Sequence, residues 1–185
     1  MFDNPNFYTI EQQKMVGIWP LTYLSGHVMV PYINRIKKSS VVGLEIGVLK
    51  GETTRIILDA CPNVTKYYGV DPYEAYFDTD HQKTQEDMNL FKATADANLA
   101  GYTQYELVQS VSEKVDFILI DGKHTYDQVK ADLTTYYPLL NDGGLMFCHD
   151  YNNPEVNRAV KDWRRENKVS QPILVSPNFI WMWYK

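Results

Sequence analysis

The sequence predicts a doubly wound α/β domain, in which a mostly parallel sheet carries helices on both faces. Short apolar runs alternate with stretches of helical periodicity from Val41 to the end of the chain, which is the pattern of parallel strands joined by helical crossovers. The length of 185 residues suits one domain of ordinary size. Glycine or ionisable residues follow several of the apolar runs, at the strand ends where such sheets bind their ligands.

The first five strand-like runs occupy residues 41–46, 66–70, 105–109, 115–120 and 145–148. Helical stretches lie between them at residues 53–60, around Met88 to Leu99, at residues 126–140 and at residues 156–167. Thr125 and Gln128 have the spacing of a capping box, and residues 141–144 have the composition of a turn. The last two strands, residues 172–175 and 179–184, must be antiparallel because the segment between them is too short for a crossover.

Residues 1–40 differ from the rest of the chain. They carry aromatic side chains, Pro20 and Pro31, and a helical stretch near residues 24–38. A unit of this size seldom folds alone. We therefore expect a lid or helical cover over residues 1–40, packed on a main domain of residues 41–185.

Composition limits the partners and the compartment. The formal net charge of -5 argues against nucleic acid. The two cysteines form no disulfide framework, no signal peptide is recognisable, and no apolar stretch could cross a bilayer. These features predict a cytoplasmic protein without a membrane partner. The 14 tyrosines and 4 tryptophans suggest an aromatic surface at a pocket or at a contact between copies in a homo-oligomer.

The segment from Glu45 to Gly51 is the strongest local signal. Gly47 lets the chain turn sharply off its strand and lets a ligand approach the backbone. The glycine spacing differs from the dinucleotide fingerprint. An ordinary turn between strand and helix is the alternative. Asp71 ends the next strand, where its carboxylate can accept hydrogen bonds from both ribose hydroxyls of an adenosine. The alternative for Asp71 is a residue that caps the following loop.

Ionisable side chains follow two further strands. Asp121 and His124 lie in the loop after residues 115–120, and His149 and Asp150 follow residues 145–148. Because these strand ends are expected to be neighbours, the four side chains should converge. Burying so many ionisable groups is costly unless they are paired or bind a cation.

Together, Glu-x-Gly-x-x-x-Gly, Val-Asp-Pro, Ile-Asp-Gly-x-His-x-Tyr and Gly-Gly-x-x-x-x-His-Asp resemble the class I S-adenosylmethionine-dependent methyltransferases. Within them, the motifs are similar to the small-molecule O-methyltransferases of the macrocin type and, more distantly, to catechol O-methyltransferase. The resemblance covers about Val41 to Lys185. It implies a Rossmann-like sheet of seven strands in the order 3-2-1-4-5-7-6, with strand 7 antiparallel.

The resemblance also implies roles for the site residues. Glu45, Gly47 and Gly51 would line the methionine and ribose part of the cofactor, and Asp71 would hold the ribose. Asp121 would contact the cofactor and, with Asp150, bind a divalent cation, by default Mg²⁺ or Mn²⁺. His149 stands where those relatives carry an acidic ligand, which opens the choice of metal. His124 falls at the position of a general base.

The sequence therefore predicts a methyltransferase that acts on a hydroxyl of a small molecule, such as a sugar. A metal-independent methyltransferase is the first alternative. A nicotinamide-dependent oxidoreductase is less favoured because the GxGxxG motif is missing. A non-catalytic binding module is disfavoured because it has no use for a proton acceptor beside carboxylates. The sequence does not identify the methyl acceptor.

Overall fold

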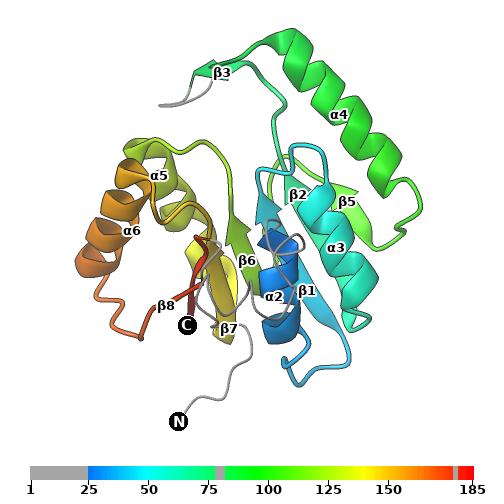
Figure 1. Ribbon diagram of the computed structural model, residues 1–185. Coiled ribbons are helices and arrows are strands. Elements are labelled where there is room, and N and C mark those ends of the chain that lie inside the picture. The colour runs from blue at the N-terminus through cyan, green and yellow to red at the C-terminus, as the bar shows by residue number, and fades with distance from the viewer. Residues whose placement is uncertain (1–24, 78–81, 177–178) are drawn as a thin grey trace, which may run out of the picture.

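A sheet of seven strands forms the centre of the protein (Figure 1). The computed structural model describes residues 25–77, 82–176 and 179–185. The sheet runs in the order β5-β2-β1-β6-β7-β9-β8. Its strands are β1 (Val41–Ile46), β2 (Val64–Val70), β5 (Tyr105–Leu107), β6 (Val115–Ile120), β7 (Leu140–Cys148), β8 (Leu174–Val175) and β9 (Trp181–Tyr184). This is the predicted order 3-2-1-4-5-7-6, and β9 is antiparallel to both β7 and β8, as expected.

Helices cover both faces of the sheet, which confirms the doubly wound fold class (Figure 1). They are α2 (Ser25–Ile33), α3 (Glu52–Ala60), α4 (Gln85–Leu99), α5 (Tyr126–Tyr136) and α6 (Pro154–Glu166), with a short 3₁₀ helix η1 (Tyr137–Leu139). α5 and α6 lie on one face, and α2 and α3 lie on the other. The two-stranded ribbon of β3 (Tyr76–Phe77) and β4 (Gln82–Lys83) precedes α4 and extends beyond the main sheet.

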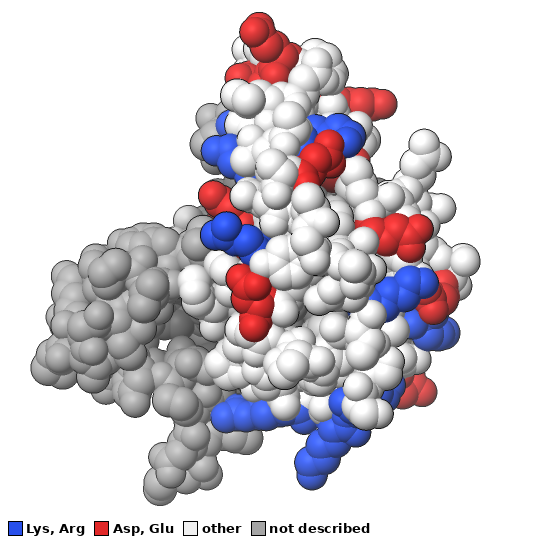
Figure 2. Space-filling view, turned by 90° about the vertical axis from the view of Figure 1, so that its right-hand side faces the viewer, with Lys and Arg blue, Asp and Glu red and all other residues white. Residues whose placement is uncertain are grey.

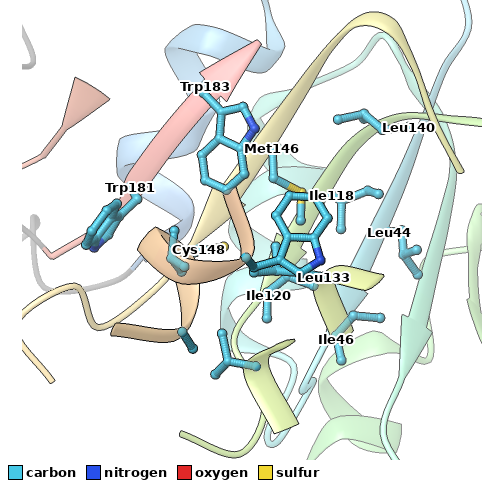
Figure 3. Close-up of a cluster of buried hydrophobic side chains, with 14 of the residues drawn as sticks. Leu44, Ile46, Ile118, Ile120, Leu133, Leu140, Met146, Cys148, Trp181 and Trp183 are labelled. Atoms are coloured by element: carbon cyan, nitrogen blue, oxygen red, sulfur yellow. The ribbon is translucent and has the colours of Figure 1, made fainter. Parts of the chain in front are cut away.

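The larger part of the core lies between the sheet and the α5–α6 layer. Leu44, Ile118 and Trp183 are fully buried there, and Trp181 belongs to the same cluster (Figure 3). Every residue of β6 is buried. This explains why a run that is apolar at five of six positions predicted the strand correctly, since a central strand covered on both faces needs no polar side.

Helix α2 belongs to the opposite layer of the core. Met29 and Ile33 are fully buried and pack in one cluster with Ile57 of α3 and Phe117 of β6. The cover expected over residues 1–40 stays a prediction, and its first part, residues 1–24, lies outside the described residues.

Two local predictions were wrong. Thr125 is the N-cap of α5, but its side chain makes no capping hydrogen bond, so the expected capping box is absent. Residues 141–144 do not separate β7 from the preceding helix, because the strand already begins at Leu140 and the register shifts opposite Asp116. Gly143 has a φ of 76°, which accommodates this irregularity inside the strand.

The described surface mixes charges. Acidic and basic side chains are interspersed over the face shown in Figure 2. A mixed surface of this kind gives no support to a polyanionic partner. Among the described helices, none is both long enough and apolar enough to span a membrane.

Candidate functional site

A cleft of about 1020 Å³ opens at the carboxyl ends of the central strands. Its lining includes most of the residues that sequence analysis selected: Glu45, Gly47, Asp71, Asp121, His124, His149 and Asp150. They come together because β2, β1, β6 and β7 are parallel neighbours, so their carboxyl ends meet at one edge of the sheet. Gly51 is not part of this lining; it is the N-cap of α3, with a φ of 72°.

The turn after β1 depends on Gly47. Its φ is 90°, a conformation that favours glycine. A Cβ at this position would lie 2.2 Å from the carbonyl oxygen of Asp121, so no side chain fits between the two loops. The β1 and β6 loops therefore approach each other closely, and the backbone at Gly47 is open to the cleft.

Asp71 organises the same turn from the end of β2. Its Oδ2 accepts hydrogen bonds from the backbone N–H groups of Val48, at 3.0 Å, and Leu49, at 2.9 Å. Its Oδ1 accepts from the backbone N–H of Tyr73 at 2.9 Å. The alternative role considered from the sequence, a cap for the following loop, is therefore present. Because the carboxylate also lines the cleft, this role does not exclude contact with a ligand.

Glu45 is buried beneath the turn, with 1 % of its surface exposed. Its Oε2 accepts hydrogen bonds from the hydroxyl groups of Thr54 and, at 3.1 Å, Tyr67. Burial raises the pKa of Glu45 to about 8, although the hydrogen bond from Thr54 acts in the opposite direction. The carboxyl group is thus held mainly by the domain itself.

Asp121, His124, His149 and Asp150 form what we call the strand-end cluster. Each offers a ligand atom within 4.8 Å of the others. His149 Nδ1 lies 3.0 Å from Asp121 Oδ1 and 3.3 Å from Asp150 Oδ1. His124 Nε2 lies 3.2 Å from Asp150 Oδ2 and 3.7 Å from Asp121 Oδ1. The convergence expected from the sequence is therefore present, with two carboxylates and two imidazoles in contact.

The two carboxylates of the strand-end cluster favour a positive charge between them, either a protonated histidine or a bound metal ion. Burial alone would lower the pKa of His149, but the charge of Asp121 and hydrogen bonds to Asp121 and Asp150 raise it to about 10. His149 is therefore an imidazolium at neutral pH and supplies one positive charge between two carboxylates. Two carboxylates and two imidazoles also form a donor set that suits a divalent metal ion.

Several cleft residues escaped the sequence analysis. Val108 and Gln109 follow β5, where the rule of strand ends could have found them. Gln128 and Asp132 lie on α5 and line the cleft from the side. Asp132 is 6 % exposed. Its position beside the apolar stripe of α5 gave no signal of burial, because a polar residue next to such a stripe usually faces water.

Residues 44–151 match the sequence model of a family described as a methyltransferase domain. This match covers more than half of the chain and contains the turn, Asp71 and the strand-end cluster. An uncharacterized protein of Acanthamoeba polyphaga mimivirus is 24% identical over 160 residues, which cover 76% of this chain and 68% of the viral protein.

Solved methyltransferase structures share the fold. The O-methyltransferase NovP has a TM-score of 0.65 at 16% identity, over 84% of this chain and 78% of its own. The calicheamicin methyltransferase CalS11 has a TM-score of 0.62 at 16% identity, over 98% and 87%. The O-methyltransferase TomG from Streptomyces achromogenes, solved in complex with S-adenosylmethionine, has a TM-score of 0.58 at 12% identity, over 86% and 79%.

Proposed function

This chain belongs to the methyltransferase-domain family and is an S-adenosylmethionine-dependent methyltransferase, and from that premise we propose that it methylates a hydroxyl group of a small molecule. The observation that carries the proposal is the strand-end cluster, which places carboxylates and imidazoles beside the glycine turn in one cleft. Such groups can bind and deprotonate a hydroxyl acceptor. The family match disfavours the nicotinamide-dependent alternative.

The described residues fit the cofactor. S-adenosylmethionine supplies a methyl group on a sulfonium centre, which an acceptor oxygen displaces in line. Gly47 lines the cleft and lets the turn after β1 lie against the loop after β6, where a Cβ would meet the carbonyl oxygen of Asp121. Asp71 retains acceptor capacity for the ribose hydroxyls, because a carboxylate offers about four lone-pair sites and three backbone donors are present. Glu45 and Gly51 support the turn from below and from the start of α3.

Asp121 and Asp150 are the residues that would hold a divalent cation, with Mg²⁺ or Mn²⁺ as the first choice, and His149 would join them on losing its proton to the solvent. Such an ion would orient the acceptor hydroxyl and lower its pKa. A metal-independent form of the reaction is the second candidate. It is favoured by the imidazolium of His149, which already neutralises part of the carboxylate charge.

His124 is the proposed general base. We assign a proton to its Nε2, because this atom lies 3.2 Å from Asp150 Oδ2 and the charge of an ionised carboxylate at that distance favours it. The hydroxyl proton of the acceptor would then move to Nδ1. Asp150 would hold the ring in this orientation and stabilise the imidazolium that forms.

The acceptor is proposed to be a sugar or another hydroxylated metabolite. A second structure of CalS11 is described as a TDP-rhamnose 3'-O-methyltransferase, with a TM-score of 0.58 and 16% identity, which supports a sugar hydroxyl as one candidate. We further propose that the protein acts in the cytoplasm, because both cysteines are free and buried.

A screen for methyl transfer tests the proposal. Labelled S-adenosylmethionine would be offered with hydroxylated acceptors, sugars included, in the presence of Mg²⁺ or Mn²⁺ and after chelation. We expect methylation of a hydroxyl compound, with a rate that falls at least about tenfold on chelation and recovers when metal is restored. Asp150→Asn should abolish the metal stimulation, whereas Asp142→Asn, at an exposed position of β7, should retain it.

Two outcomes would change the conclusion. Full activity after chelation, together with no Mn²⁺ binding by calorimetry, would establish the metal-independent alternative. Methylation confined to nitrogen acceptors would exclude the proposed hydroxyl chemistry.

A further inference from the structure

The segment between β2 and α4 makes a left-handed turn at Tyr73. The φ of this residue is 50°, in a region that residues with a side chain seldom adopt. Such a conformation costs energy and persists only where the surrounding structure holds it. The side chain of Tyr73 is 5 % exposed and packs in one cluster with Val48, Met88 and Leu99. The buried ring therefore anchors the turn, and other side chains hold the peptide groups around it.

Gln85, the first residue of α4, binds this turn through its side-chain amide. Its Nε2 donates to the carbonyl oxygen of Tyr73 at 2.9 Å and to Asn89 Oδ1 at 3.0 Å. Its Oε1 accepts from the backbone N–H of Ala75 at 3.1 Å. The reversed amide would place its oxygen against two acceptors and its nitrogen against a donor, so these contacts determine its orientation. Gln85 thus holds a carbonyl group and an N–H group two residues apart.

The start of α4 fixes the position of Gln85. Thr84 Oγ1 accepts from the backbone N–H of Asp87 at 3.1 Å, and Asp87 Oδ2 accepts from the backbone N–H of Thr84 at 2.9 Å, which completes a capping box. Gln85 itself is exposed, so little apolar packing depends on its side chain. Its hydrogen bonds therefore connect a well-defined helix start to the turn at Tyr73.

The same turn reaches the carboxylate of Asp71. The backbone N–H of Tyr73 donates to Asp71 Oδ1 at 2.9 Å, whereas Oδ2 is held from the turn after β1 by Val48 and Leu49. Because φ is the rotation about the N–Cα bond, a change in the φ of Tyr73 turns its N–H relative to the carbonyl group that Gln85 holds. Loss of the bond from Gln85 would therefore free Oδ1 from its present direction.

We propose that Gln85 is a positioning residue, which fixes the turn at Tyr73 and through it directs Asp71 Oδ1 toward the ribose hydroxyls of the cofactor. Gln85 is not part of the lining of the cleft, so it acts through Asp71 and not by contact. This inference rests on the cofactor placement proposed above. The contribution of Gln85 to affinity should then depend on Asp71 and on the ribose hydroxyls together.

A double-mutant cycle tests this dependence. Calorimetry would measure Gln85→Met, Asp71→Ala and the variant that carries both changes, since methionine has about the length of glutamine but forms none of these hydrogen bonds. Gln82→Met makes the same replacement at an exposed position of β4 and is the matched control. The two ligands are S-adenosylhomocysteine and its 2′,3′-dideoxy analogue, which lacks both ribose hydroxyls. Melting curves without ligand would verify that each variant is folded.

We expect the wild-type protein and Gln82→Met to prefer S-adenosylhomocysteine over the dideoxy analogue at least about tenfold. Gln85→Met should weaken S-adenosylhomocysteine binding by about three- to tenfold, leave the affinity for the analogue unchanged, and have no further effect beside Asp71→Ala. Equal weakening of both ligands, or an effect that simply adds to that of Asp71→Ala, would show a general structural role and overturn the inference, as would an unchanged affinity. Wild-type affinity in Asp71→Ala would instead overturn the cofactor placement, and this inference with it.

Discussion

Replacing the buried Glu45 with glutamine should stabilise the protein, and by more at pH 7.5 than at pH 5.5. Burial raises the pKa of Glu45 to about 8 in the folded protein, against 4.5 for an ordinary glutamate. Between these values the unfolded chain has lost a proton that the folded protein keeps. The free energy of unfolding of the wild-type protein therefore receives a contribution that falls as the pH rises from 4.5 to 8.

The size of the effect follows from the two pKa values. Each pH unit between them costs about 1.4 kcal/mol, so the contribution of Glu45 falls by about 2 to 3 kcal/mol between pH 5.5 and pH 7.5. Glutamine has nearly the shape of a protonated glutamic acid and does not titrate. Its amide can also keep hydrogen bonds with the hydroxyl groups of Thr54 and Tyr67, which now bind the carboxyl group.

Urea denaturation followed by tryptophan fluorescence would measure this difference at several pH values and constant ionic strength. The quantity of interest is the stability of Glu45→Gln minus that of the wild-type protein at each pH, which removes the contributions of other titrating groups. Glu106→Gln, at an exposed position of strand β5, is the matched control and should show no such trend. A difference for Glu45→Gln that stays constant from pH 5.5 to 7.5, or that decreases, would refute the reasoning.

Two further variants examine the cleft. Asp71→Ala should weaken S-adenosylhomocysteine binding at least tenfold, about 1.4 kcal/mol, because a charged acceptor for the ribose is lost; unchanged affinity by calorimetry in a folded variant would end this placement. His124→Ala should reduce turnover about a hundredfold or more while the affinity for S-adenosylhomocysteine stays near that of the wild-type protein. Normal turnover in His124→Ala would leave this residue only a structural role.

Most of the fold could be predicted because its signals are local. The run Val115–Ile120 is apolar at five of six positions and is a central strand, and the alternation of strands and helices determined the parallel topology. The strand-end cluster followed from the topology, because residues just after neighbouring parallel strands must meet. No side-chain geometry was needed for that step.

The failures have physical causes as well. The spacing of Thr125 and Gln128 permits a capping box, but the side chain of Thr125 makes no capping hydrogen bond, which residue spacing alone does not determine. The same spacing at Thr84 and Asp87 does form a box, at the start of α4. The ribbon of β3 and β4 has strands of two residues each, which is too short for any periodicity to appear.

The contacts of Asp132 lay beyond the reach of a local pattern for a different reason. Its carboxyl group lies near Gly122, in the loop before the helix, because a Cβ at Gly122 would be 3.7 Å from Oδ2. The surroundings of Asp132 therefore include a loop as well as its own helix. Sequence periodicity describes one element at a time and does not contain this information.

Asp71 shows how one motif residue can shape the site and still be available to bind. Its three backbone donors come from the turn after β1 and from the loop after β2, so the carboxylate joins both walls of the cleft. The bonds from Val48 and Tyr73 are partly buried, and the bond from Leu49 is exposed. The same bonds hold the side chain in one conformation before any ligand arrives. Ordering the Asp71 side chain costs about 1 kcal/mol of conformational entropy, and this cost is met on folding. A ribose that binds to the remaining acceptor sites of Asp71 would therefore not have to overcome it.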